Sequence, residues 1–511
     1  MKYLKQDSYD PYFASHMITD NEIIRLIFGF KLRYLRLQHH MSYQDLADQT
    51  GLSVSYLNDI EKGKRYPKPD KINSIAEAFE VDYNYMVATN ASKRLQPIID
   101  LLTSKFFKLF PLEEFGIKTE KLLELFTNTP DKVTSFISTI FKIARNYQVG
   151  EPQFYKEALR SYQDMHNNYF PKLEQAVVDF RKKHKVKGTV PYTTSFLESK
   201  LESYGVKIDR KAIANNIVLS TIRSYYDSER QILFIQGGLT SAQEIFIIAR
   251  ELGFQHLDLK IRPYENAIIE VDSFEKLLNN YKASHFAAAL LMDEQELIAD
   301  VKQIARENKW ESSLISDLID KYHVTPETLM QRLTNILPHH FGIEDLFFLR
   351  LTGDKDLKSY KMTKDLHLSQ LHNPYNNELN ESYCHRWLSI TALRDLRLKK
   401  FKKSESKIII DAQISKYWQT DNEYLCLTIA KPSQSRQENG VSVTIGMLVN
   451  EKLKSTFYFL SDPQMKVREV HTTCERCGIE DCEARVSPPL FIEKEAEREE
   501  LLENLKGLIS E

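Results

Sequence analysis

The chain has little cysteine, no long apolar run and almost no net charge. Only five of its 511 residues are cysteines, too few and too unevenly spaced for the disulfide framework of a secreted domain. Its longest apolar runs, such as residues 286–292, fall far short of the roughly 18 residues that a membrane-spanning helix needs. Lys+Arg 69 and Asp+Glu 71 give a net charge of −2, which excludes a uniformly basic coat for nucleic acid but not a local basic face.

The remaining composition is that of an ordinary folded protein. Hydrophobic residues make up 42% and charged residues 27%, which excludes a disordered or collagen-like chain. The start, MKYLKQDSYDPYF, has no apolar stretch, so we expect no secretory signal. Together with the scarcity of cysteine, this predicts a reduced, cytoplasmic protein that is not bound to a membrane.

The spacing of apolar residues predicts a multidomain, α-rich protein, because 511 residues exceed what one hydrophobic core can organise. Helical spacing dominates up to residue 345, interrupted by β-type runs at 217–222 and 231–236. Further β-type runs are present at 346–353, 406–418, 423–431, 441–449 and 456–461. The expected segments are an all-α domain at 21–92, a helical connector at 93–185, an α+β domain at 186–345, an α+β domain with clustered cysteines at 346–492 and a C-terminal helix at 493–511.

Residues 41–87 have the sequence pattern of a helix-turn-helix. Ser42 and Ser53 are suited to cap two short helices, Gly51 supplies the turn between them, and a further helix is expected from Lys68. In a helix-turn-helix the second helix enters the major groove. The residues predicted to close the core are Leu46, Ala47, Leu52, Val54, Leu57, Ile60, Ile72 and Ala76.

The exposed face of this second helix is the predicted DNA-binding surface. Residues 25–71 hold nine Lys/Arg and five Asp/Glu, a local charge of +4 that suits phosphate contacts. A helical protein-interaction domain is the alternative. The polar residues available to a groove are Ser53, Ser55, Tyr56, Asn58 and Lys62, with Lys64 and Arg65 just beyond.

The same segment resembles the XRE/Cro-repressor-type helix-turn-helix family over about residues 22–88. The match rests on Gln44, on the A-x-x-x-G-L-S turn and on the E-x-G-x-R-x-P ending. The resemblance implies that Gln44 contacts DNA. It also implies a double-stranded operator and a homodimer, because such domains bind pseudo-palindromic sites. The connector at 93–185 and the helix at 493–511 are both candidates for the dimerising element.

Residues 241–257, followed by KASHFAAALLM, resemble the ImmA/IrrE family of zincin-like metallopeptidases. That family places two zinc-binding histidines one turn apart on this helix, with a catalytic glutamate between them. Here Arg250 and Phe254 stand at the histidine positions and Lys282 falls near the third ligand, while Glu251 remains. Arginine and phenylalanine cannot bind zinc. We therefore expect a pseudo-peptidase, not an enzyme, with a binding role.

Three cysteines crowd together near the C-terminus. Cys474, Cys477 and Cys482 form a C-x2-C-x4-C pattern, which predicts a metal or cluster site with Cys384 as the fourth ligand. Cys426 lies in a β-type run and is expected to be a small buried hydrophobe. Thiolate ligation suits both a 4Fe–4S cluster and zinc, so the spacing leaves both open.

The arrangement of these parts resembles the short-chain fatty acyl transcriptional regulators over most of residues 22–492. The resemblance includes the upstream Cys384 followed by Trp387. It implies a small-molecule effector, a short-chain acyl-CoA, and an iron–sulfur cluster. We therefore interpret the chain as a transcriptional regulator that senses a metabolite or redox state. The alternatives are a partner-controlled antitoxin or phage-type repressor with structural zinc, and a metallopeptidase, against which the missing histidines argue.

Overall fold

The structure is a computed structural model that describes most of the chain, in two compact units. One unit reaches to Tyr162 and includes Glu270–Leu277, and the other holds the remainder, from Gln163 to Glu511. Most of the connector predicted at 93–185 and most of the run at 217–222 lie outside the described residues. Those described are 20–88, 99, 114–116, 151–186, 191–213, 219, 222–263, 273–368, 381–401, 407–433 and 438–509.

The first unit begins with five helices around a small apolar core. Gly29 allows α1 and α3 to approach closely, since a Cβ atom there would lie 2.3 Å from the carbonyl oxygen of Ile60. The predicted core is confirmed except for Val54, which is 38% exposed because it is the first residue of α3 and faces outward. The helices are α1 (Asp20–Gln38), α2 (Tyr43–Thr50), α3 (Val54–Glu61), α4 (Pro69–Ala78) and α5 (Tyr83–Val87).

The second unit combines a helical part with a small sheet. In that sheet β1 pairs parallel with β3, and β2 pairs antiparallel with the other side of β3. The strands are β1 (Lys207–Asp209), β2 (Ser224–Asp227) and β3 (Ile232–Ile235). The helices of this region are α10 (Glu151–Met165), which the first unit includes in large part, α11 (Pro171–Lys183), α12 (Thr194–Glu202), α13 (Ser241–His256), α14 (Phe274–Leu291), the start of which belongs to the first unit, α15 (Glu294–Ala305), α16 (Ser313–Tyr322) and α17 (Pro326–Phe341).

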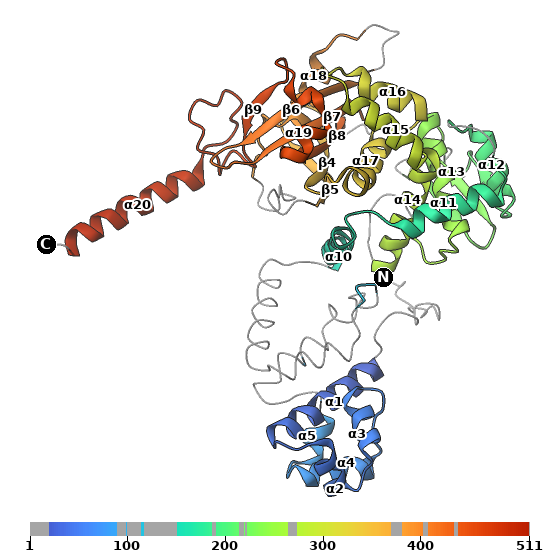
Figure 1. Cartoon of the computed structure of the whole chain (residues 1–511), viewed down its shortest axis with the longest axis vertical. Helices are drawn as coiled ribbons and strands as arrows, with labels where there is room; N and C mark the ends of the chain where they lie inside the picture. Colours follow the sequence, from blue (N-terminus) through green and yellow to red (C-terminus); the bar gives the residue numbers. More distant parts are fainter. Residues whose placement is uncertain are drawn as a thin grey trace, which may run out of the picture. The chain divides into compact units, whose positions relative to one another are not determined.

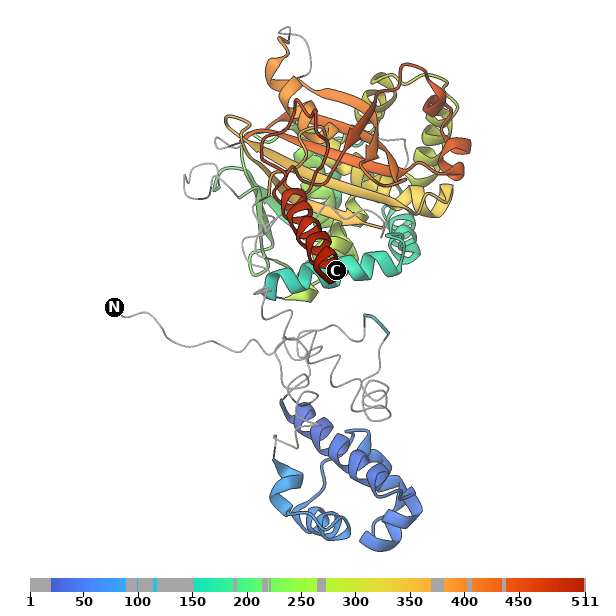
Figure 2. The same cartoon turned by 90° about the vertical axis from the view of Figure 1, so that its left-hand side faces the viewer.

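A larger sheet forms the C-terminal part, in the order β5-β4-β8-β7-β6-β9. Helix α17 packs against one face through β4 and β8, and α18 packs against the other through β6, β7 and β8 (Figure 1 and Figure 2). Because both faces are covered, the central strand β7 is buried along most of its length. The elements are β4 (Leu346–Asp354), β5 (Tyr360–His367), α18 (Leu388–Leu398), β6 (Ile409–Tyr417), β7 (Glu423–Pro432), β8 (Glu438–Leu448), α19 (Glu451–Thr456), η3 (Tyr458–Ser461), β9 (Val467–Val470) and α20 (Leu490–Ile509).

The predicted strand at 456–461 is wrong. Phe457 and Phe459 are buried and Tyr458 is half exposed, so burial alternates as it would in a strand, while the backbone forms the end of α19 and a short 3-10 helix. The edge strands β1, β2, β5 and β9 were not predicted, because each is short or carries few apolar residues. None of the helices in the described part of the chain is both long and apolar enough to cross a membrane.

Candidate DNA-binding surface and sensor sites

Local capping fixes where α2 begins and ends and where α3 begins. The Ser42 hydroxyl accepts the Asp45 N–H while the Asp45 carboxylate accepts the Ser42 N–H, which forms a capping box. Gly51 ends α2 at φ 67°, a left-handed conformation that favours glycine. Ser53 caps α3 by accepting the Tyr56 N–H. The sequence therefore specifies both helix starts and the turn between them.

A buried ion pair ties α1 to α3. Two guanidinium nitrogens of Arg36 donate to the two carboxylate oxygens of Glu61, at 2.7 and 3.0 Å. The Tyr43 hydroxyl donates to the same carboxylate at 2.7 Å, and the Arg36 guanidinium lies 4.1 Å from the Tyr43 ring centroid. Burial and the Glu61 contact raise the pKa of Tyr43 to about 12, so its hydroxyl stays a donor. This triad was not predicted, and it holds α3 in place.

A second buried cation links α1 to the end of α5. Lys31 has no exposed surface, and its Nζ donates to the carbonyl oxygens of Tyr85 at 2.6 Å and Ala88 at 2.5 Å. Burial lowers the pKa of Lys31 to about 8. The C-terminal carbonyls of a helix attract a cation, so Lys31 caps α5 where the described part of this domain ends.

The predicted DNA-binding residues lie on the outer surface of α2, α3 and the turn after α3. Gln44, Ser55 and Lys62 are exposed and Asn58 is half exposed. Ser55, Asn58 and Lys62 recur at helical spacing, so they share one face of α3. Gln44, in the first turn of α2, donates to Asp48 at 2.9 Å.

Some of the other residues predicted to contact DNA already make contacts within the domain. Ser53 is occupied as the cap of α3, and Tyr56 packs in part against the core. Lys64 is exposed, and Arg65 forms an ion pair with Asp59 at 3.1 Å while its side chain remains 61% exposed. With Arg36, Glu61 and Lys31 buried, the outward charge of this region comes from the other residues of the basic segment.

Helix α13 carries Arg250 and Phe254, which occupy the positions of the two zinc-binding histidines. The Glu251 carboxylate accepts Arg262 Nη1 at 2.7 and 2.9 Å and Gln255 at 2.7 Å, so it is engaged in an ion pair. The Arg262 guanidinium lies 4.6 Å from the Phe254 ring centroid. Arg250 Nη2 donates to Ser224 Oγ at 3.3 Å. This arrangement occupies the glutamate that a peptidase would use as a base.

The nearby histidines are packed into the fold. His256 Nδ1 lies 3.1 Å from the Tyr204 hydroxyl. His285 is buried, with Nε2 2.8 Å from Glu174 Oε1, and Arg332 donates to both oxygens of the same carboxylate at 2.5 and 2.9 Å. Neither histidine faces Glu251 in any contact among the described residues. Their positions give them structural roles within the second unit.

Four of the five cysteines lie on two segments that the fold joins. A β-bridge pairs Tyr383 with Thr473, and the Cys474 N–H donates to Ser382 at 2.8 Å, which brings Cys384 to the C-terminal cysteine loop. The cysteines are free thiols, and burial raises the pKa of Cys384 to about 11. Cys426 is buried in β7, as predicted.

Arg485 organises this cysteine loop and was not predicted. It donates to the carbonyl oxygens of Cys474 at 3.0 Å, Cys477 at 2.9 Å and Ile479 at 2.6 Å. Within the described residues, no three Cys, His, Asp or Glu side chains are arranged as a metal would require. As they lie, the residues do not fit a bound metal or cluster.

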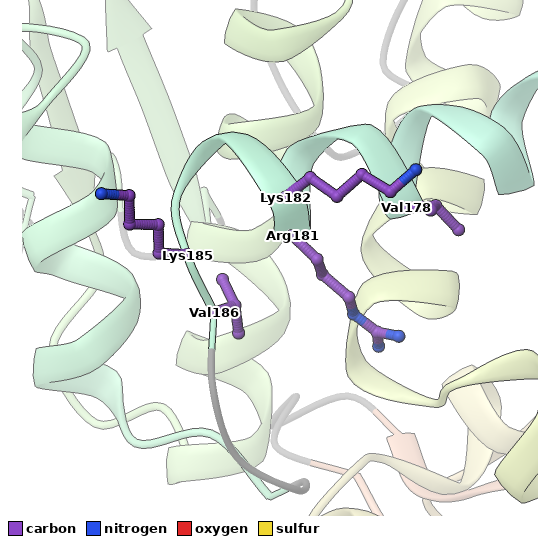
Figure 3. Close-up of a pocket in the computed structure, with 5 residues that line it drawn as sticks. All are labelled: Val178, Arg181, Lys182, Lys185 and Val186. Atoms are coloured by element: carbon purple, nitrogen blue, oxygen red, sulfur yellow. The ribbon is translucent and has the colours of Figure 1, made fainter.

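A basic pocket lies at the end of α11. Val178 and Val186 contribute apolar surface, and Arg181, Lys182 and Lys185 contribute charge. Figure 3 shows Lys182 and Lys185 pointing to opposite sides, while Arg181 points away from both. Arg181 is paired with Asp293 and donates to the carbonyl oxygen of Leu290. These cations do not converge on a common ligand.

Comparison with known proteins identifies two parts of the chain. Residues 32–86 match a helix-turn-helix family model, and residues 205–334 match the IrrE N-terminal-like domain. Control protein C.BamHI of Bacillus amyloliquefaciens is 42% identical over 65 residues, which are 12% of this chain and 78% of that protein. The chain belongs to the XRE-type helix-turn-helix family.

Two other similar proteins are a curated repressor and a protein of solved structure. The HTH-type transcriptional repressor RghR of Bacillus subtilis (strain 168) is 40% identical over 57 residues, 11% of this chain and 42% of that protein. A solved structure of a Mycobacterium tuberculosis transcriptional regulator has a TM-score of 0.45 and 17% identity. That similarity covers 65% of this chain and 93% of the other.

Proposed function

We propose that this XRE-family regulator binds a double-stranded operator as a homodimer and that its second unit senses a small molecule, without peptidase activity. The observation that carries the DNA-binding part is the exposed face of α3 beside Gln44, on helices whose caps and buried ion pair fix their geometry. Glutamine and asparagine side chains suit base edges, and the lysines suit phosphates. The pairing of Glu251 with Arg262 supports the non-enzymatic role.

Replacing Gln44 or Ser55 with alanine should weaken operator binding by about 5- to 150-fold. This range corresponds to about 1–3 kcal/mol for loss of a direct base contact. The operator is first selected from random duplexes with the wild-type chain, and affinity is then measured by fluorescence anisotropy at several salt concentrations. Lys64→Ala should instead weaken binding to all duplexes and reduce the salt dependence.

Asn73→Ala provides the matched control for this experiment. Asn73 is exposed on α4, which carries none of the proposed contacts, so this variant should bind as the wild type does. Wild-type affinity in both the Gln44→Ala and Ser55→Ala variants would show that the assigned face is wrong.

We propose a cysteine-ligated metal at Cys384, Cys474, Cys477 and Cys482, which needs these side chains to rearrange. Sulfur donors on two joined segments, and the Arg485 contacts that shape the loop, support it. A 4Fe–4S cluster would make the second unit sensitive to redox state, whereas zinc would be structural and would favour a partner-controlled repressor. A short-chain acyl-CoA is the proposed effector.

Metal analysis and visible absorbance of anaerobically purified protein should distinguish these metals. A brown chain with broad absorbance indicates the cluster, and a colourless chain with one zinc indicates the structural site. Cys477→Ser should lose most of the metal, and Cys426→Ala should keep it because Cys426 lies within β7. A wild-type chain that contains neither metal would contradict the proposed site.

A further inference from the structure

Helix α20 is exposed along its length and carries leucines on its surface. Every described position from 493 to 506 is exposed. Leu501 is 64% exposed, and Leu502 and Leu505 lie on the same side of the helix because they follow at helical spacing. The helix holds six Glu and three Lys/Arg, a net charge of −3. Since most helical stability comes from packing an apolar face, α20 calls for a partner that covers these leucines and balances its charge.

The start of α20 is attached to the cysteine loop. The Phe491 N–H donates to the carbonyl oxygen of Glu475 at 3.0 Å, and the Arg476 guanidinium lies 4.3 Å from the Phe491 ring centroid. Arg476 is itself paired with Glu381, at 2.6 Å. From this attachment α20 leads away from α18 and the large sheet (Figure 1). The leucines near its end therefore face outward from the copy that carries them.

A basic surface lies where the end of α18 meets the turn between β4 and β5. Arg397, near the end of α18, donates to the carbonyl oxygen of Asp356 in that turn at 2.8 Å, which joins the two segments. Residues 354–361 and 394–401 together hold seven Lys/Arg and three Asp, a net charge of +4. Leu398 is 78% exposed, more than any other large apolar side chain in the described part of the chain. These two segments form the α18 basic surface.

The charges of the α18 basic surface are not neutralised within the fold. The Asp354 carboxylate is used by the turn, where it accepts the backbone N–H groups of Lys358 and Ser359 at 2.8 and 3.1 Å. The exposed lysines of this surface that form no ion pair with any described residue are Lys358, Lys361, Lys399 and Lys400. The surface therefore presents several cations around an exposed leucine, which is the complement of the acidic, leucine-bearing α20.

We propose that α20 of one copy docks on the α18 basic surface of a second copy, which returns the same contact. The proposal rests on the homodimer proposed above and deepens it by naming the two surfaces that meet. Opposite charges steer and orient such a contact, and the leucines of α20 cover Leu398. Two identical contacts related by a two-fold axis close a dimer and leave neither surface exposed. A second copy is favoured over the same copy because α20 leads away from α18.

Sedimentation velocity of the full chain over a concentration series measures the dimer. Leu501→Ser/Leu505→Ser should raise the dissociation constant by about tenfold or more, because the substitution removes apolar surface from the contact. Both leucines are exposed, so the melting temperature of the dissociated chain should not fall. A double variant that dimerises as the wild type does would overturn the proposal.

A charge exchange tests which surfaces meet. Lys399→Glu/Lys400→Glu reverses the basic surface, and Glu495→Lys/Glu497→Lys reverses the charges that flank the leucines of α20. Each variant alone should dimerise about tenfold or more weakly, because like charges then face each other. An equimolar mixture of the two should restore a heterodimer of near wild-type affinity, since each α20 then meets a surface of opposite charge. A mixture that stays as weak as its components would contradict the proposed pairing.

Lys302→Glu/Lys309→Glu provides the matched control, at two exposed lysines on α15 and just after it. This variant makes the same change in net charge and should dimerise as the wild type does; an equal loss would overturn the proposal. If Lys399→Glu/Lys400→Glu keeps its dimer but loses affinity for unrelated duplex DNA, the surface binds DNA and the proposal is wrong.

The outcomes separate this interface from the proposed function. A dimer that persists in all of the variants keeps the homodimer and overturns only the surfaces assigned to it, whereas a monomeric wild-type chain overturns both. Operator binding is measured separately on the same variants. A chain that dimerises as expected but binds no operator would contradict the proposed DNA binding and leave this interface in place.

Discussion

Glu61→Ala should destabilise the N-terminal helices by about 3–5 kcal/mol and raise the population of their unfolded state. The substitution leaves the Arg36 guanidinium buried between α1 and α3 without its carboxylate and removes the acceptor of the Tyr43 hydroxyl. Breaking a buried ion pair by removing one partner costs about 3–5 kcal/mol. Small domains are stable by only about 5–15 kcal/mol, so the loss is a large part of the total.

Hydrogen exchange of the α1 and α3 amides in the full chain measures this effect domain by domain. Tyr43→Phe keeps the ion pair and should cost only about 1 kcal/mol. The double variant Arg36→Met/Glu61→Leu replaces the pair by apolar side chains and should recover much of the lost stability. Wild-type protection in Glu61→Ala would mean that the pair contributes little to the fold.

Glu174→Gln should destabilise the second unit by about 3–5 kcal/mol, because Arg332 has no exposed surface and would lose both of its bonds to a carboxylate. His285 contacts the same carboxylate from α14. Glu174 lies on α11 and Arg332 on α17, so this one side chain joins three helices. Urea unfolding followed by tryptophan fluorescence measures the change, with Glu202→Gln, at an exposed position on α12, as the control.

The Glu174 network also predicts how stability depends on pH. Burial would raise the pKa of Glu174, but the hydrogen bonds and charges of His285 and Arg332 outweigh it and hold the pKa well below the ordinary value of 4.5. A carboxyl with a lowered folded-state pKa contributes its full stability above pH 4.5 and loses it as the pH falls further. Glu174→Gln should therefore flatten the acid side of the stability curve, and an unchanged slope would contradict this role.

Short-range patterns predicted the N-terminal domain well. Ser42, Gly51 and Ser53 act through neighbours three or four residues away, so the sequence specifies their caps and turn directly. The one error in the core, Val54, arose because an apolar residue at the first position of a helix need not face inward. Hydrogen bonds between near neighbours could thus be predicted from the sequence without knowledge of the tertiary structure.

Contacts between residues far apart in the chain could not be predicted from the sequence. Glu61 and Arg36 are 25 residues apart, and Glu174 and Arg332 are 158 apart, so no local pattern could pair them. The loss of the zinc ligands at Arg250 and Phe254 was visible in the sequence, but the capture of Glu251 by Arg262 was not. The predicted strand at 456–461 failed because alternating burial also occurs in a 3-10 helix beside a sheet.

The Lys31 contacts have a mechanical consequence. The Nζ atom of Lys31 lies inside the domain and donates hydrogen bonds to the carbonyl oxygens of Tyr85 and Ala88. These two residues are next to the point where the chain leaves the described helices. A pull on the chain beyond Ala88 is therefore resisted by α1, the longest helix of the domain, and not by the five-residue helix α5 alone. Lys31 thus holds the C-terminal end of α5 to α1. Force applied to the chain at Ala88 therefore acts on the same helix that carries Arg36.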